Sequence, residues 1–131
     1  MKKKTCFVIS KINDAEKLLL SSNYQSSITI FFIKNYLIKG FGIEWLKTMK
    51  VVLKKKFKNH KIEYYVDSGY DYGLCINLIK QKIKYIKLKS NKIILHKIKE
   101  IAKKNKVVLN PDFNVLDISN IKKIDKKLKH L

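Results

Sequence analysis

The sequence contains no arginine, one proline, four glycines and two cysteines. The lack of arginine argues against a sequence-specific DNA-binding protein, because bidentate contacts to guanine are chiefly made by arginine and lysine replaces it poorly. So little proline and glycine excludes collagen-like and proline-rich sequences. Cys6 and Cys75 fall at interior positions without metal-ligand spacing, which predicts a reduced, cytoplasmic protein.

Long hydrophobic runs are also missing. The most apolar stretch, residues 28–38, is interrupted by Lys34 and Asn35 and is shorter than the ~18–20 residues of a membrane span. The apolar run at residues 6–9 ends at Ser10, short of the ~7–15 residues of a signal-peptide core. We therefore expect neither a membrane span nor a secretory signal.

Acidic residues are few, at 10 against 30 basic residues, so the net charge is +20. Every basic residue is lysine, which A and T alone can encode, as they can isoleucine and asparagine. Codon bias therefore accounts for part of the charge, but it does not account for the scarcity of acids. The remaining excess predicts attraction to polyanions at low salt.

Strand-like and helix-like segments alternate along the 131 residues, which suffice for one compact domain. Short β-branched and apolar runs predict five strands, at residues 5–10, 28–33, 62–67, 83–88 and 107–109. Apolar residues at helical spacing predict four intervening helices. We expect their starts to be a cap at Asn13 or Asp14, residue 43 after a loop at 34–42, a cap at Asp71, and a cap at Ser90 or Asn91.

This alternation with short connections predicts an α/β fold with parallel strands joined by right-handed crossovers. We expect a three-layer, open, mostly parallel five-stranded sheet of the flavodoxin-like kind, and a half (βα) barrel as the alternative. Residues 1–111 would form the domain. Residues 112–131 would form a basic C-terminal tail with a helix at residues 120–131.

The candidate ligand site follows from this fold, because ligands of open parallel sheets bind beyond the carboxyl ends of the strands. These ends give twelve candidate ligand-binding residues: Ser10, Lys11, Lys34, Asn35, Asp67, Ser68, Gly69, Tyr70, Asp71, Lys89, Ser90 and Asn110.

Residues 66–73 are the most informative part of that set. Two carboxylates, Asp67 and Asp71, stand four residues apart with Gly69 and Tyr70 between them. Backbone amides at the following helix start could hold an anion, and Asp67 could act as a nucleophile, base or metal ligand. A purely structural interpretation is also open, with Asp71 as an N-cap, Gly69 relieving a turn and Asp67 accepting local amides.

Two resemblances bear on the same residues. Asp67, Ser90 and Pro111, after the third, fourth and fifth strands, are similar in order to a response-regulator receiver domain. That family also has an acidic pair after the first strand and a lysine before the proline, where this chain has Ser10-Lys11 and Asn110. We therefore expect neither a Mg²⁺ site nor phosphorylation. Residues 67–79 resemble small bacterial α/β proteins without assigned function, a likeness that implies no activity.

Other motifs are missing. There is no phosphate-binding loop, dinucleotide fingerprint, H-E-x-x-H or C-x-x-C sequence, so we assign no metal and no cofactor. His96, in mid-helix between Leu95 and Lys97, fits a boundary residue better than a catalyst, and Cys75 on an apolar helix face fits the core better than a nucleophile.

Lysine clusters give a second kind of candidate, for contact with a polyanion. The residues are Lys54, Lys55 and Lys58 at one helix end, and Lys122, Lys123, Lys126 and Lys127 in the tail. A solvated lysine surface enlarged by codon bias is the structural alternative. Four tyrosines could stack on bases, but we expect at least one of Tyr64 and Tyr65 to lie in the core.

Three functional hypotheses follow. The first is a non-enzymatic module that binds an anionic small molecule or a protein partner at the carboxyl ends of the strands. The second is a nucleic-acid-associated protein that uses its lysines. The third is a small enzyme acting on a phosphorylated or carboxylated substrate with Asp67 or Asp71, which lacks a His, Cys or metal constellation to complete a mechanism.

Overall fold

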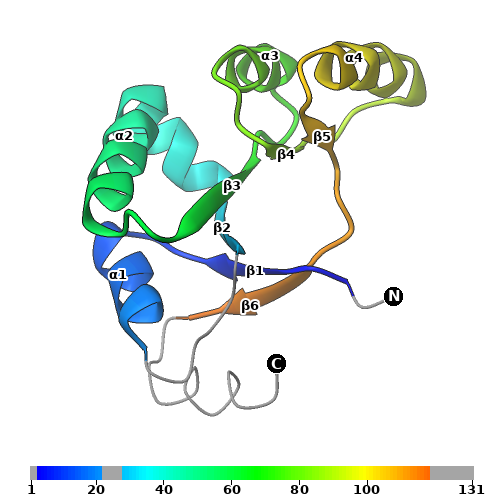
Figure 1. The fold of residues 1–131 in the computed structure, drawn as a ribbon. Coiled ribbons are helices and arrows are strands. Elements are labelled where there is room, and N and C mark those ends of the chain that lie inside the picture. The colour runs from blue at the N-terminus through cyan, green and yellow to red at the C-terminus, as the bar shows by residue number, and fades with distance from the viewer. Residues whose placement is uncertain (1–2, 22–27, 119–131) are drawn as a thin grey trace.

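The computed structural model of the chain describes residues 3–21 and 28–118 (Figure 1). Within them, strands alternate with helices up to the last two strands. The elements are β1 (Thr5–Val8), α1 (Ile12–Leu20), β2 (Ile28–Ile33), α2 (Asn35–Lys56), β3 (Lys61–Asp67), α3 (Tyr72–Lys80), β4 (Tyr85–Lys87), α4 (Lys92–Lys104), β5 (Val108–Leu109) and β6 (Asn114–Asp117).

The strands form a single open sheet in the order β5-β4-β3-β2-β1-β6, and every neighbouring pair is parallel. This confirms the expected α/β class with an open parallel sheet, now with six strands rather than five. The additional strand is β6, which pairs with β1 from Thr5–Asn114 to Val8–Asp117. The sheet therefore continues past residue 111, where we expected the domain to end. The predicted tail helix lies outside the described residues.

The four helices lie along one side of the sheet (Figure 1). A right-handed crossover between adjacent strands taken in sequence order places each helix on the same face. Buried residues of all four helices accordingly share one core with Phe31 and Val66 of the sheet. The other face carries a smaller apolar cluster centred on Phe32, Tyr65 and Tyr85, which contains no residue of the four described helices. Of the three layers expected, the described residues form two.

The connection between β5 and β6 shows that the sheet is curved. Five Cα steps, from residue 109 to residue 114, reach at most about 19 Å, whereas a flat six-stranded sheet separates its edge strands by about 24 Å. The edges must therefore approach each other. Phe113 in this connection packs on the smaller cluster, with ring centroids 5.6 Å from Tyr65 and 4.8 Å from Tyr85. The curvature and the one-sided helix layer are features of the half-barrel alternative, within a sheet that stays open.

Helix α2 corrects one sequence expectation, the loop at residues 34–42. The helix begins at Asn35, and only Gly42, at φ 86°, interrupts it. Its first turns are helical because Leu37 and Ile38 are buried in the core, and this packing outweighs the helix-breaking tendency of Gly40.

The helix starts match the predicted caps in two of three cases. Asp71 accepts a hydrogen bond from the Leu74 amide and Asn91 accepts one from the Ile94 amide, both at 2.9 Å. The cap expected at Asn13 or Asp14 is wrong, because α1 already begins at Ile12. Asp14 Oδ2 instead reaches back from the first turn and accepts from both the amide and the hydroxyl of Ser10, each at 2.9 Å.

Burial follows the predicted pattern with one exception. Both cysteines are buried, as expected, and neither forms a disulfide. The helical spacing of Ile94, Ile98, Ile101 and Ala102 in the sequence predicts that all four face inward. Ile101 is nevertheless 39% exposed, because Ile98 and Ala102 occupy the buried side of α4. Among the described residues, no helix combines the length and the hydropathy needed to cross a membrane.

Candidate functional site

Parallel pairing brings the carboxyl ends of the strands to one edge of the sheet, and the predicted site residues follow them there. A hollow of about 540 Å³ opens beyond the ends of β2, β3 and β4; we call it the carboxyl-edge hollow. It brings together six predicted residues and one that we did not predict, Lys39. The lining consists of Asn35, Lys39, Asp67, Gly69, Tyr70, Asp71 and Lys89.

Asn35 and Asp67 fix the loop that forms the floor of this hollow. Asn35 Nδ2 donates to the Asp67 carbonyl at 2.9 Å, and Asp67 Oδ1 accepts from the Gly69 amide at 2.8 Å. Gly69 has φ +61°, and a Cβ there would lie 3.1 Å from Asn35 Nδ2. Glycine is therefore required both for the left-handed backbone and for the close approach of Asn35.

Asp71 is an ionised cap at the wall of the hollow. The hydrogen bond from the Leu74 amide, helped by the nearby Lys39 ammonium, lowers the pKa of its carboxyl group below the ordinary 3.8. Lys39 Nζ lies 3.5 Å from Asp71 Oδ2. Asp71 is therefore a carboxylate at neutral pH, which makes it unsuited to act as a general acid.

Lys89 connects the end of β4 to the loop after β3. Its backbone amide donates to the Gly69 carbonyl at 2.7 Å, and its Nζ lies 5.9 Å from the centroid of the Tyr70 ring. Tyr70 is 78% exposed, so the lysine and the ring together present a cationic and an aromatic surface to solvent.

A second, smaller hollow of about 280 Å³ lies beyond the ends of β1, β2 and β6. It contains three more predicted residues, Ser10, Lys11 and Lys34, together with Asp14 and residues that the sequence did not single out. These are Val8, Ile9, Tyr36, Leu37 and Asp117. Asp117 belongs to β6, which the sequence did not predict, so this carboxylate had no signal as a site residue.

The remaining three candidates line neither hollow. Ser68 is fully buried and its hydroxyl donates to the Lys87 carbonyl at 2.6 Å. Asn110, at φ 51°, holds the end of β4 through Leu88, accepting from its amide at 2.8 Å and donating to its carbonyl at 3.0 Å. Ser90 is half-buried just before α4. Ser68 and Asn110 thus serve the fold.

Lys39 and Tyr36 line the two hollows, and they would have been predicted if residues 35–42 had been assigned to a helix. Lys39 stands four residues after Asn35, which is one helical turn, so both face the hollow only because α2 begins at Asn35. Our expectation of a loop there concealed this spacing.

Other side chains that could take part in catalysis or bind a metal are either unreactive or paired with a neighbour. Burial raises the pKa of the Cys75 thiol to about 11, so it is protonated at neutral pH. His96 is exposed and lies 3.5 Å from Glu100 on the same helix. Among the described residues, no cluster of His, Cys, Asp and Glu has the arrangement of a metal site.

The polyanion candidates divide by position. Lys54, Lys55 and Lys58 are all exposed around the end of α2. Lys122, Lys123, Lys126 and Lys127 lie outside the described residues. Tyr64 and Tyr65 are both buried, which leaves Tyr70 and Tyr72 as exposed rings.

Comparison of the sequence with protein-family models and with curated proteins finds no match.

Proposed function

We propose that this protein is a non-enzymatic α/β module that binds an anionic ligand at the carboxyl edge of its sheet. The ligand is a small anionic molecule or an acidic segment of a partner protein. The observation that carries the proposal is the carboxyl-edge hollow, where Lys39 and Lys89 flank a loop held by Asn35. The net charge of +20 adds a long-range attraction for anions.

Exposed aromatic rings support recognition at this edge. Among the aromatic side chains that the structure describes, the most exposed are those of Tyr70 (78%), Tyr36 (65%), Phe41 (62%) and Tyr72 (56%). Tyr36 and Phe41 lie in the first two turns of α2, Tyr70 lies in the turn between β3 and α3, and Tyr72 is the first residue of α3. Aromatic side chains are enriched in protein interfaces, where they contribute a large share of the binding energy.

The state of the two carboxylates favours binding over catalysis. Asp67 accepts the Gly69 amide, and Asp71 caps α3 while pairing with Lys39. A general acid or base needs a pKa near the working pH and access to a substrate proton. Because the pKa of Asp71 is lowered, Asp67 is the one remaining carboxylate of the pair that the enzyme hypothesis can use as a general acid or base.

We further propose a reducing, cytoplasmic setting. Both cysteines are unpaired and buried, in agreement with a protein that does not depend on disulfides.

The test is a thermal-shift screen of the full chain with carboxylates, phosphorylated metabolites, nucleotides, acidic peptides and a random oligonucleotide, at about 50 and about 200 mM salt. The proposal expects stabilisation by a few anions that persists at the higher salt. It also expects the double variant Lys39→Ala/Lys89→Ala to lose most of that stabilisation.

The matched control is Lys103→Ala/Lys104→Ala, which removes the same charge from the last turn of α4. Because helices and strands run in opposite directions here, that turn lies toward the other edge of the sheet. Equal losses in both double variants would mean that overall charge, not the hollow, attracts the anion.

A second candidate function, association with nucleic acid, is favoured by one observation. Lys54, Lys55 and Lys58 form an exposed cationic group around the end of α2, and residues 45–62 contain no acidic side chain. The neighbouring Lys56 pairs with Glu16, which leaves these three lysines to contact a polyanion. Stabilisation by the oligonucleotide alone, lost at the higher salt, would support this candidate and not the first.

A further inference from the structure

A groove of about 470 Å³ lies at the opposite edge of the sheet, where β3 and β4 begin; we call it the amino-edge groove. The second half of α2 and the turn between α3 and β4 border it, and the first residues of β3 lie between them. It has no described residue in common with the carboxyl-edge hollow. Its lining is Lys50, Val51, Lys54, His60, Lys61, Ile62, Glu63, Tyr64, Lys82, Ile83 and Lys84.

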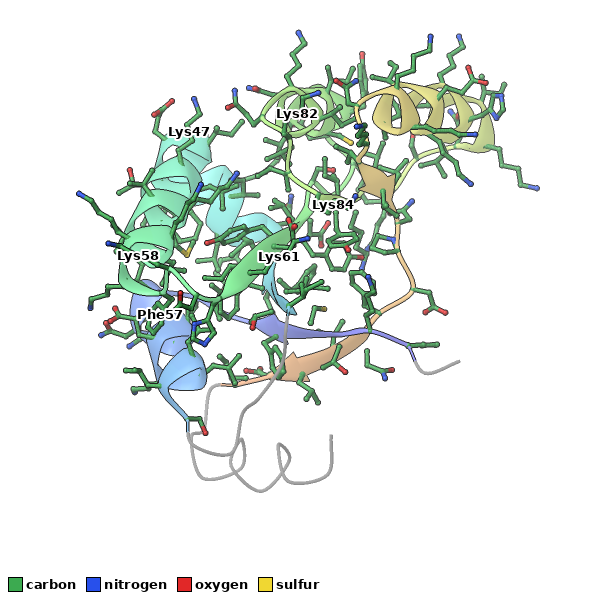
Figure 2. All side chains as sticks on the ribbon, in the orientation of Figure 1. Lys47, Phe57, Lys58, Lys61, Lys82 and Lys84 are labelled. Atoms are coloured by element: carbon green, nitrogen blue, oxygen red, sulfur yellow. The ribbon has the colours of Figure 1, made fainter. Side chains whose placement is uncertain are left out.

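Positive charge dominates this groove, with five lysines against a single acid. The acid, Glu63, alternates along β3 with Tyr64, so its side chain belongs to the other face of the sheet. Lys82 and Lys84 bind Asn105 Oδ1 and the Lys106 carbonyl, at 2.9 and 3.2 Å, and so fix the turn before β4. Figure 2 shows Lys61 and Lys84 near the starts of β3 and β4.

Of the three remaining lysines, Lys50 stands over the Tyr64 ring, and the other two are available to pair with a ligand. Lys54 on α2 and Lys61 at the start of β3 form no ion pair with any described residue, and both are exposed. Lysines near the C-terminus of a helix also offset the helix dipole, and this accounts for Lys54. It does not account for Lys61, which belongs to a strand.

Tyr64 supplies an independent observation. Its side chain lines the groove and is only 4% exposed, and its hydroxyl is buried without a hydrogen-bond partner among the described residues. Burial, helped by the charge of Glu63, raises the pKa of this hydroxyl, so it stays protonated and able to donate. A buried donor left unpaired is costly, which points to a partner that binds from outside the chain.

We propose that the amino-edge groove binds a phosphate-bearing small molecule of nucleotide size. Lys54 and Lys61 pair with the phosphate oxygens, and the Tyr64 hydroxyl donates a hydrogen bond to one of them. The side chains of Val51, Ile62 and Ile83 provide an apolar surface for the rest of the molecule. The volume lies in the ~300–1,000 Å³ range of small-molecule sites. This inference does not rest on the proposed function at the other edge.

Lys50 has a defined part in this binding. Its Nζ lies 6.0 Å from the centroid of the Tyr64 ring, so the ammonium group stands over the ring. A phosphate that attracts the ammonium moves Lys50 aside and gives access to the hydroxyl.

The experiment is isothermal titration of the full chain with ADP, adenosine, pyrophosphate and a dT oligonucleotide, at about 50 and about 200 mM salt. We expect ADP to bind at one site and to remain bound at the higher salt, and adenosine, which lacks phosphate, to bind far more weakly. Tyr64→Phe should weaken ADP binding about tenfold, the loss expected for one hydrogen bond to a charged group. Lys61→Ala should also weaken it.

The controls separate this site from general charge. Lys47→Ala removes the same charge from α2 outside the groove, where Lys47 pairs with Glu44, and should leave ADP affinity unchanged (Figure 2). Lys39→Ala/Lys89→Ala should also leave it unchanged, which keeps this test separate from that of the carboxyl-edge hollow. The proposal is overturned if Tyr64→Phe binds ADP as the native chain does, if Lys47→Ala and Lys61→Ala weaken binding equally, or if only the oligonucleotide binds.

Discussion

Phe113 offers a direct test of how the connection between β5 and β6 covers one face of the curved sheet. This residue belongs to the short connection between the two edge strands, and its ring packs edge-on against Tyr65 and Tyr85. Phe113→Ala removes both aromatic contacts and exposes the smaller apolar cluster. The connection would then cross the concave face of the sheet, the face opposite the helices, without a side chain to cover the cluster there.

The expected magnitude follows from burial. A fully buried Phe→Ala change costs about 3–5 kcal/mol, but Phe113 is only half-buried, so we expect a loss of about 2 kcal/mol in the free energy of unfolding. That loss lowers the melting temperature by roughly 5–10 °C for a chain of this size. Phe113→Leu, which keeps apolar volume but loses the ring contacts, should lose about half as much.

Urea unfolding followed by the fluorescence of Trp45, the single tryptophan, measures this change. Val115→Ala is the control, because Val115 lies two residues further on and is 50% exposed. We expect that control to change stability by less than about 1 kcal/mol. If Phe113→Ala costs no more than Val115→Ala, the connection does not cover the concave face and our account of the curvature is incorrect.

Four other predictions concern Tyr64, Gly69, Asp71 and the two cysteines. Tyr64→Phe should raise the unfolding free energy of the unliganded chain by about 1 kcal/mol in urea titrations, because it removes an unpaired buried hydroxyl; a loss would show that this hydroxyl is paired. Gly69→Ala should lose about 1–2 kcal/mol in the same assay, since alanine is strained at positive φ and its Cβ meets Asn35; no loss would contradict the required left-handed turn. The lowered pKa of Asp71 adds stability that is present above the ordinary value of 3.8 and is lost as the pH falls below it. Asp71→Asn should therefore make stability depend less on pH in the acid range, as monitored by circular dichroism, and an unchanged dependence would contradict the shift. Burial raises the pKa of Cys6 and of Cys75 to about 11, against an ordinary 9.0, so the stability that the two thiols contribute is full below pH 9 and falls toward pH 11. A thiol reagent at pH 8 should react with them only after unfolding, and rapid reaction of the native chain would contradict their burial.

The fold class was predictable because strand and helix periodicities differ strongly in this sequence. Residues 28–33 are β-branched or aromatic at nearly every position, and β2 has the same bounds. The helix start predicted from a cap at Asp71 likewise coincides with the start of α3 at Tyr72. The sixth strand was not predictable in this way, because residues 114–117 include asparagine and aspartate and acquire strand structure by pairing with β1.

The candidate site was predictable as far as it depends on strand ends alone. Parallel pairing brings Asn35, Asp67 and Lys89 to one hollow from three separate strand ends, as the fold rule requires. Lys39 escaped prediction because local glycines indicated a loop, and only the burial of Leu37 and Ile38 makes that segment helical. The amino-edge groove had no sequence signal, since the unpaired state of the Tyr64 hydroxyl depends on its neighbours in space.

The central claim, an anion-binding hollow at the carboxyl edge, is tested most directly by residue-resolved NMR. The measurement is a ¹H–¹⁵N titration of the full chain with the anion that stabilises it most in the thermal screen. The account predicts saturable shifts at the backbone amides of Gly69, Tyr70 and Lys89, and their loss in Lys39→Ala/Lys89→Ala. Shifts confined to other parts of the chain, with these amides unmoved, would contradict it.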